Sequence, residues 1–526
     1  MLFNSIEFLI FFPAVVIIYF LLPHRWQWQW LLASSCFFFG FSYYLYYDPV
    51  NFPYPTNIPW YIFNLFSVVS VIIINYLLAI LIEKSKTTGS TRPKVYLVIG
   101  IAYPIILLLL FKYLNFFNQT INHIARLLNL NYPENILKII IPLGISYYTF
   151  HIISYLVDVY RGIQKAERHF GIFSLYILFF PKIVAGPIER AQNLIPQFYE
   201  EKKFDYARIK DGLLLFAWGL FKKLVIADRA AIVVNEVYGD PYGYPGIYLI
   251  IAHLSFIFQV YCDFSGYSDM AIGIARIMGF KLSDNFRRPY LSSSITELWR
   301  RWHITMISWF RDYVYIPMGG NRVAKWRWQY NTFITFILSG FWHGANWTFI
   351  TWAALNALHI LISIWTAPVR KKLMALVNLK KFPSFYKILT ILITFTSFTL
   401  SGIFFRAASM ADAFYIISHL FTGFDVFIKT VLTLNYDMLK SFLVIQNKIT
   451  FLGYSKPAFL PEMITLALGM IVLATIEIIQ ERSNRRIRDM IAQKPWYIKW
   501  ALYYCLLFAL VFLGMYSNQQ FIYFRF

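Results

Sequence analysis

Long runs of apolar residues recur along the chain and are separated by short polar segments. Many of these runs reach about 18 residues, the length at which a helix crosses the hydrocarbon core of a bilayer. We therefore predict an all-α polytopic membrane protein without a sizeable soluble domain. The first run, Ile6 to Leu22, lacks a basic n-region and a small-residue cleavage site, so we expect a retained span.

Interruptions in this pattern divide the chain into three zones and a tail. Residues 1–165 are plain hydrophobic spans, residues 181–347 mix charges, prolines and glycines into apolar sequence, and residues 348–519 return to plain spans. Lipid-facing helices do not tolerate the polar density of the middle zone, so that zone must line a cavity or fold back. An aromatic tail of residues 520–526 ends the chain.

Composition agrees with the membrane assignment. Of the 526 residues, 59% are hydrophobic and only 14% are charged, unlike a soluble domain. The net charge of +22 would suit nucleic-acid binding, but the basic residues fall in short loops and not on one surface, so we expect no nucleic acid. By the positive-inside bias we place these loops in the cytoplasm. They are Lys84–Lys94, Arg161–Arg168, Lys202–Lys223, Arg370–Lys387 and Arg482–Lys499.

Segments with few or no basic residues, such as Tyr46 to Pro59 and Thr422 to Pro461, are expected on the outer face. The alternation puts the N-terminus outside, and a last span near Trp500 to Tyr516 puts the C-terminal tail outside as well. The three cysteines are widely separated in apolar sequence, which argues against disulfides and a thiolate metal site.

The middle zone contains a proline-rich break and a carboxylate cluster. Two prolines and a glycine between Phe180 and Arg190 must break a helix there. Asp263 and Asp269 come directly after an apolar run, and buried carboxylates need partners. We expect a structural ion-pair network that includes Asp263, Asp269, Arg190 and Arg301. The available partners of the two carboxylates are Arg287, Arg288, Arg300, Arg301 and Arg311.

One aromatic-rich amphipathic helix is predicted from Glu297 onward, ending in a turn at Pro317, Gly319 and Gly320. At 3.6 residues per turn, one face of this helix gathers apolar and aromatic side chains, and it suits the cytoplasmic interface. The residues on that face are Trp299, Trp302, His303, Met306 and Phe310.

Beside this helix, Arg311, Arg322, Lys325 and Arg327 form a basic rim. Such a rim can hold lipid phosphates, and it can equally receive the phosphates of an acyl-CoA donor. The charge count does not separate these two possibilities.

Two histidines follow tryptophans, in Trp302-His303 and Trp342-His343. His343 lies in apolar sequence, where a polar group without partners is costly, so a function or a specific hydrogen bond must offset that cost. An imidazole can take and return a proton near neutral pH, which favours catalysis. A structural role is the alternative, and it is the one that we assign to His151, His253, His359 and His419.

Several ordered motifs together resemble the membrane-bound O-acyltransferase family, and within it the bacterial alginate O-acetyltransferase branch. They are Val184–Arg190, Asp263–Asp269, Trp302-His303 with Trp309–Tyr313, Gly319–Arg322 and Trp342–Gly344. The resemblance covers residues 1–526 as one acyltransferase domain. It implies a funnel-shaped multi-helix bundle, with re-entrant and interfacial helices around a central tunnel, in the bacterial inner membrane.

The same resemblance implies roles for individual residues. His343 would be the catalytic histidine, which takes a proton from an acceptor hydroxyl and returns it to the leaving thiolate. His303 would orient the donor or stabilise the oxyanion, a role also open to Asn346 or a tryptophan N–H. The candidate substrate-binding residues are Trp302, Trp342, Arg311, Asn321, Arg322 and Asn346.

The C-terminal tail, Gln520 to Phe526, is too short to span a membrane and too apolar to lie in water, so we expect it to fold back into a groove. It resembles the C-terminus of the same branch, which implies that Tyr523 accepts the acetyl group. The alternative is simple packing of an amphipathic terminus on the outer surface.

The implied reaction needs no cofactor. Acetyl-CoA is the expected donor, and an extracytoplasmic SGNH-type acetyltransferase is the expected partner that acetylates an exported polysaccharide or cell-wall glycan. Another acyltransferase, for D-alanyl transfer to teichoic acid or for lipid or protein acylation, stays open. So does a non-enzymatic transporter, which would explain broken helices but would give His343 no part in acetylation.

Overall fold

The structure is a computed structural model that describes residues 1–46, 59–130, 132, 141–376, 381–433, 450–451, 454–455, 459–516 and 521. Most of the two predicted outer segments and of the tail, including Tyr523, lie outside the described residues.

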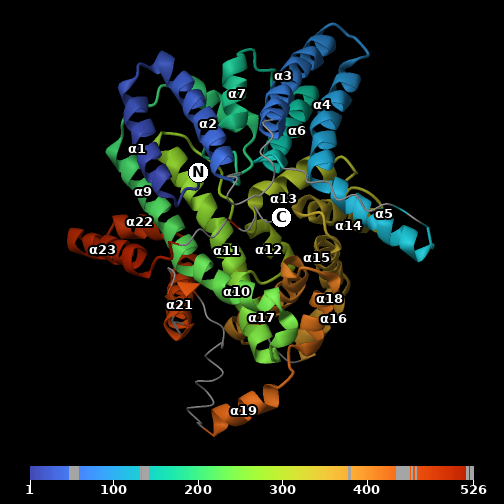
Figure 1. The fold of residues 1–526 in the computed structure, drawn as a ribbon, viewed down its shortest axis with the longest axis vertical. Coiled ribbons are helices and arrows are strands. Elements are labelled where there is room, and N and C mark those ends of the chain that lie inside the picture. Colours follow the sequence, from blue (N-terminus) through green and yellow to red (C-terminus); the bar gives the residue numbers. More distant parts are fainter. Residues whose placement is uncertain are drawn as a thin grey trace.

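Helices make up most of the described chain (Figure 1). The α-helices of the first half are α1 Ile6–Leu21, α2 His24–Tyr46, α3 Pro59–Thr87, α4 Pro93–Leu108, α5 Leu114–Leu127, α6 Ile145–Arg161, α7 Phe170–Leu178, α8 Ala191–Tyr199, α9 Tyr206–Leu220, α10 Asp228–Gly239 and α11 Gly246–Ile277. Those of the second half are α12 Ile295–Arg301, α13 Ile304–Phe310, α14 Lys325–His343, α15 Trp347–Trp365, α16 Ala367–Leu376, α17 Pro383–Arg406, α18 Met410–His419, α19 Phe424–Leu432, α21 Phe459–Ser483, α22 Ile487–Ala492 and α23 Trp496–Leu513.

Short elements connect these helices. The π-helical turns are η1 Leu109–Tyr113, η2 Phe221–Ala227 and η5 Arg311–Tyr315, and the 3-10 turns are η3 Pro241–Gly243 and η4 Pro289–Leu291. An antiparallel strand pair is formed by β1 Thr450–Phe451 and β2 Tyr454–Ser455.

Seven helical segments of the described chain are long and apolar enough to cross a membrane. They are Asn64–Thr87, Pro93–Leu127, Gly246–Ile277, Trp347–Trp365, Pro383–Arg406, Pro461–Ser483 and Trp496–Leu513. The prediction of an all-α polytopic membrane protein is therefore confirmed. The predicted first and last spans correspond to α1 and α23, although α1 is shorter than these seven segments.

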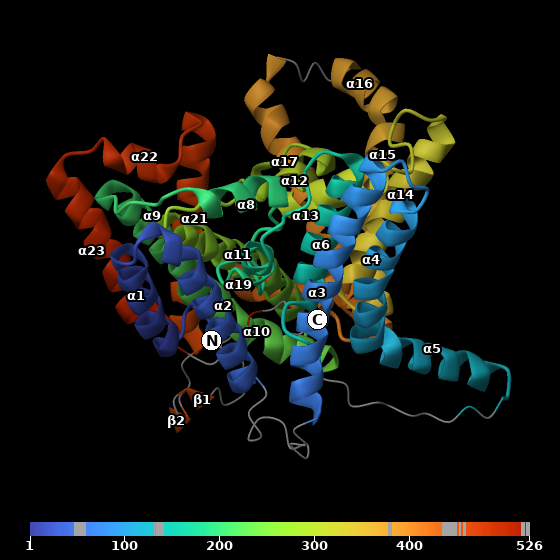
Figure 2. The ribbon, with the colours of Figure 1, turned by 90° about the horizontal axis from the view of Figure 1, so that it is seen from above.

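The long helix α11 runs through the middle of the molecule and packs against α9 (Figures 1 and 2). Gly212 and Gly219 of α9 face Gly273 and Gly266 of α11, and a Cβ atom at any of them would lie 2.6–2.8 Å from its partner's carbonyl oxygen. Small residues let two membrane helices approach this closely, and van der Waals packing then stabilises the pair.

The carboxylates of α11 pair with two lysines of η2. Lys222 Nζ lies 2.6 Å from Asp269 Oδ2, and Lys223 Nζ lies 2.8 Å from Asp263 Oδ1 and 2.7 Å from Asp228 Oδ1. The prediction of arginine partners for Asp263 and Asp269 was therefore wrong. The predicted loop Lys202–Lys223 is also mostly helix, because α9 continues into the buried turn η2.

The structural assignment of Arg190 and Arg301 fits other ion pairs. Arg190 lies 3.3 Å from Asp312 Oδ2, and Arg301 bridges Glu297 at 2.6 Å and Glu481 at 2.9 Å. Burial alone would raise the pKa of Glu297. Hydrogen bonds from Ser293 and the charge of Arg301 outweigh this effect and hold that pKa below its ordinary value. These arginines thus connect α8 to η5 and α12 to α21.

We expect Lys223→Met to destabilise the protein by about 3–5 kcal/mol, because it leaves the carboxylates of Asp263 and Asp228 buried without their cation. Thermal unfolding of the detergent-solubilised protein measures this change. Glu201→Ala is the control, since Glu201 and Lys203 form an exposed pair, which contributes only about 0–1 kcal/mol. Equal unfolding midpoints for the two variants would contradict a stabilising role of the buried cluster.

Candidate active site

A buried turn between α7 and α8 contacts α13, which begins next to His303. The predicted helix break is confirmed, since α7 ends at Leu178 and α8 begins at Ala191. Residues 179–189 are all buried, so this turn lies inside the protein. The Ile188 N–H donates to Thr305 Oγ1 over 3.0 Å, which ties the turn to α13.

The predicted single helix from Glu297 is broken at His303, so that prediction was wrong. α12 ends at Arg301, His303 adopts a left-handed φ of 42°, and α13 begins at Ile304. The preceding chain segment holds the break, because Arg287 N–H donates to Arg301 O and Ile304 N–H donates to Asn285 O, each over 2.9 Å. The periodicity of apolar residues along a helix cannot reveal hydrogen bonds to a segment elsewhere in the chain. A non-glycine residue in this conformation costs about 1–2 kcal/mol.

The predicted apolar face is nevertheless buried. Its members Trp299, Trp302, His303, Met306 and Phe310 are each at most 5% exposed. The break therefore preserves the burial of this face while it changes the direction of the chain at His303.

His303 lies fully buried between aromatic rings. Its ring meets the ring of Phe264 edge-on at 4.5 Å and lies 6.3 Å from the ring of Trp342. Its Nδ1 lies 3.2 Å from Asn285 Oδ1, whereas its Nε2 has no hydrogen-bond partner among the described residues. One ring nitrogen is thus fixed by the protein, and the other is left for a ligand or water.

His343 is the last residue of α14 and lies in an aromatic pocket. Its ring centroid lies 4.8 Å from Trp342, 5.1 Å from Trp352 and 5.4 Å from Phe405. The structure therefore brings three predicted site residues together, because Trp342 has His303 and His343 as neighbours.

Two residues of η1, which the sequence reasoning missed, cap the carbonyl end of α14. Lys112 Nζ donates to Trp342 O over 2.8 Å and to His343 O over 3.0 Å. The Tyr113 hydroxyl donates to Phe341 O, and its ring stacks on Phe341 at 4.4 Å. The last carbonyls of a helix have no partners within the helix, so these contacts satisfy them and fix the helix end that carries His343. A lysine inside an apolar span was the available sequence signal.

The other predicted substrate-binding residues have different surroundings. Trp302 packs among buried aromatic rings such as Phe398, 5.3 Å away. Asn346 caps α15, with its Oδ1 accepting from Thr348 N–H over 3.0 Å and its Nδ2 donating to Ala408 O over 3.2 Å. The residues of the predicted basic rim are exposed, as is Asn321; they are Arg311, Arg322, Lys325 and Arg327.

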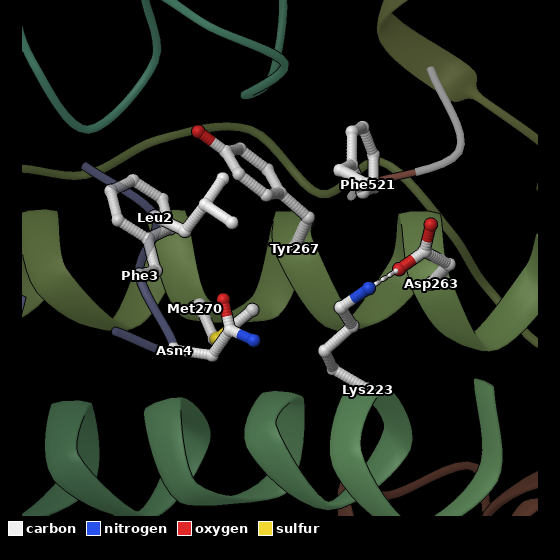
Figure 3. Close-up of a pocket in the computed structure, with 8 residues that line it drawn as sticks. All are labelled: Leu2, Phe3, Asn4, Lys223, Asp263, Tyr267, Met270 and Phe521. Carbon is white, nitrogen blue, oxygen red and sulfur yellow. Dashed lines mark ion pairs between the residues drawn. The ribbon is translucent and has the colours of Figure 1, made fainter. Parts of the chain in front are cut away.

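Phe521, the one described residue of the tail, is buried in the interior. It is 2% exposed, and its ring lies 4.9 Å from Tyr267 and 6.0 Å from Phe264. Figure 3 shows it above the Lys223–Asp263 ion pair, in a small pocket lined also by Leu2, Phe3, Asn4, Tyr267 and Met270. Since Phe264 also contacts His303, a single side chain connects this tail residue to the site.

Comparison with known proteins agrees with this picture. The membrane-bound O-acyltransferase family model matches residues 167–410, which include both histidines. A probable alginate O-acetylase AlgI of Azotobacter vinelandii is 35% identical over 370 residues, which are 69% of this chain and 68% of the relative.

Two further relatives have other acceptors in their names. A peptidoglycan O-acetyltransferase of Helicobacter pylori is 34% identical over 410 residues, 73% of this chain and 72% of the relative. A teichoic acid D-alanyltransferase of Bacillus subtilis is 30% identical over 250 residues, 43% of this chain and 59% of the relative.

The apolar helices and the match to this family define a membrane-embedded enzyme as the class. The chain belongs to the membrane-bound O-acyltransferase family. It is a multi-pass O-acyltransferase.

Lys112→Met is expected to lower the acyl-transfer rate by about 10- to 100-fold, because it releases the helix end that positions His343. Lys112→Arg should retain most of the rate, since a cationic donor remains. Initial rates of the purified protein in lipid nanodiscs at saturating donor measure both variants.

Lys86→Met is the matched control. Lys86 Nζ also donates to a carbonyl in the last turn of a helix, Tyr160 O of α6, over 2.6 Å, but no candidate catalytic residue ends that helix. Equal rates for Lys112→Met and Lys86→Met would refute the positioning role of Lys112.

Proposed function

We propose that this enzyme takes an acetyl group from acetyl-CoA on the cytoplasmic side and moves it through the membrane. An extracytoplasmic SGNH-type acetyltransferase then places it on an exported polysaccharide or cell-wall glycan. The enzyme would lie in the bacterial inner membrane with its C-terminus outside. The acetylase and acetyltransferase relatives support acetyl as the transferred group.

The single observation that carries the proposal is the convergence of His303, Trp342 and His343 in a buried aromatic pocket. Two imidazoles are costly in such surroundings unless their chemistry is used. The residues come from separate parts of the chain, at the α12–α13 break and at the end of α14, so the fold and not local sequence unites them.

The chemistry is transfer of an acyl group from sulfur to oxygen. The acceptor oxygen attacks the thioester carbonyl carbon, a C–O bond forms, and the C–S bond breaks. His343 takes the hydroxyl proton and returns it to the leaving thiolate, so the step is balanced. His303 orients the reactants, and the exposed basic rim around Arg311 and Arg322 is available for the phosphates of the donor or of lipid headgroups.

Tyr523 is the proposed first acceptor. Its phenol would form an ester, and phenolate is a better leaving group than an alkoxide, so the acetyl group could pass to the partner. The burial of Phe521, two residues away, supports a tail that enters the protein. Its indirect contact with His303 through Phe264 supports entry toward the same site.

D-alanyl transfer is the second candidate function, because the chain also resembles the Bacillus subtilis teichoic acid D-alanyltransferase. That reaction would use the same histidines with another donor. Incubation with radiolabelled acetyl-CoA, or with a D-alanyl-loaded carrier protein, separates the two candidates. A transporter without covalent chemistry would transfer label from neither donor.

His343→Ala should lower acetylation by about 10²- to 10⁴-fold, the range over which a positioned acid–base group contributes. Alkali-labile acetate on the exported glycan of the host measures the effect, with protein abundance followed by immunoblot. His359→Ala is the control, since we assign His359 a structural role. Undiminished glycan acetate in the His343→Ala strain at normal abundance would exclude catalysis by His343.

Tyr523→Phe is expected to abolish acetyl transfer to the partner and to leave protein abundance unchanged, because only the hydroxyl is lost. Mass spectrometry of the C-terminal peptide after incubation with acetyl-CoA, without the partner, should detect an acetyl group on the wild-type tyrosine. Tyr516→Phe is the control. An unmodified Tyr523 would rule out the relay through the tail.

A further inference from the structure

The hydrogen bonds around Asn285 determine which nitrogen of His303 carries the proton. Asn285 precedes α12, and its side chain is 1% exposed. Its Oδ1 lies 3.2 Å from His303 Nδ1, 3.3 Å from Thr305 N and 2.9 Å from Thr305 Oγ1. The amide therefore contacts His303, where the chain breaks, and the first turn of α13.

The orientation of this amide is not arbitrary. The Thr305 backbone N–H can only donate, so the Asn285 atom that faces it must be the carbonyl oxygen. On the other side, Asn285 Nδ2 donates to Ser268 Oγ of α11 over 3.1 Å. The Thr305 hydroxyl already accepts from Ile188 N–H over 3.0 Å, which leaves its own proton to donate to Asn285 Oδ1. The contacts with α13 and with α11 thus agree on one orientation.

A fixed carbonyl oxygen requires a donor at His303 Nδ1. In the neutral ring one nitrogen carries the proton and the other offers a lone pair, so Nδ1–H leaves Nε2 as an acceptor. Nε2 is buried, and among the described residues it has no hydrogen-bond partner.

We propose that Asn285 is a positioning residue that holds neutral His303 in the Nδ1–H tautomer, so that Nε2 accepts a hydrogen bond from the substrate. This inference rests on the proposed function. The bound group must be an N–H or O–H donor. Because the acceptor hydroxyl has a single proton, which His343 takes in the proposed function, we assign the donor to an amide N–H of the acyl donor's arm. Of the two roles open to His303, the neutral ring can orient a reactant but cannot donate to an oxyanion from Nε2.

The charged groups around His303 leave this tautomer undisturbed. On the side of α14, the His303 ring faces His343, which lies near Lys112 of η1. Next to Phe264 on α11, Asp263 is paired with Lys223. Next to Asn285, Asp284 is paired with Arg486 and Arg287. The nearby carboxylates are therefore engaged elsewhere, and the neutral amide is the group at Nδ1.

Asn285→Asp tests the proposal. A carboxylate at Nδ1 would stabilise the imidazolium and raise the pKa of His303, so Nε2 would stay protonated up to a higher pH. The acid limb of the pH–rate profile should move to higher pH by about one unit or more. The measurement is the rate of coenzyme A release from acetyl-CoA in nanodiscs between about pH 5 and pH 9. An imidazole changes its charge within this range.

Two control variants separate this effect from general damage. Ser268→Ala removes a hydrogen bond to Asn285 without changing the group at Nδ1, and Asn75→Asp puts a carboxyl in place of a buried amide of α3. Both should keep the wild-type acid limb. An unshifted limb in Asn285→Asp, or the same shift in either control, would overturn the proposal.

A measurement on the wild-type protein does not depend on whether Asn285→Asp folds. Nitrogen-15 NMR of histidine-labelled protein, with the His303 signals assigned from their loss in His303→Gln, should show a protonated Nδ1 and an unprotonated Nε2. The opposite tautomer would overturn the proposal. A fully active His303→Gln would instead refute the role of His303 in the proposed function and leave the tautomer standing.

The same kinetics identify the source of the hydrogen-bond donor. If an amide of the donor arm binds Nε2, His303→Gln should raise the KM for acetyl-CoA. If the Tyr523 hydroxyl bound there instead, His303→Gln would slow acetylation of the C-terminal peptide at saturating acetyl-CoA and leave that KM unchanged, which would contradict the assignment. An unchanged KM for acetyl-CoA together with an unchanged rate of peptide acetylation would contradict substrate binding at Nε2.

Discussion

The site depends on how the carbonyl end of α14 is satisfied. The last carbonyls of a helix have no partners within it, and in an apolar interior an unsatisfied carbonyl costs as much as a lost hydrogen bond or more. Lys112 and Tyr113 satisfy three successive carbonyls, those of Phe341, Trp342 and His343. Because the donors project from another span, the position of His343 is set by the packing of two helices.

The central helix α11 connects this site to the rest of the protein. Through Asp263 and Asp269 it pairs with the lysines of η2, and its glycines bring α9 into close contact. Through Phe264 and Ser268 it contacts His303 and Asn285. The ion pairs therefore fix α11, the helix that supports the chain break at His303. Phe521 packs against the same helix, beside both the ion pairs and Phe264.

Much of the fold could be predicted from the sequence, because span length and polar density are local properties. The apolar runs indicated the membrane helices, and the prolines near Phe180 indicated the buried turn. Periodicity gave the buried face of Trp299 to Phe310 but missed the break at His303, because that break is held by backbone bonds to residues 285 and 287. The partners of Asp263 were missed because Lys223 looked like part of a cytoplasmic loop.

Part of the site could also be predicted from local sequence. The two Trp-His pairs stand out in the sequence, so His303, Trp342 and His343 could be chosen. Asn285 and Tyr113 act through contacts with residues distant in the chain, and their residue types alone do not indicate a role. Lys112 was missed although a lysine inside an apolar span is itself a signal. For Asn346, the sequence allowed an oxyanion contact, whereas its amide caps α15 in the structure.

The central claim is that His303 and His343 serve one acyl-transfer site. An experimental structure of the enzyme in nanodiscs with a non-hydrolysable thioether analogue of acetyl-CoA tests it most directly. We expect the acyl carbon to lie between the two imidazoles, beside Trp342. Density for the acyl group in the basic rim, away from both histidines, would contradict it.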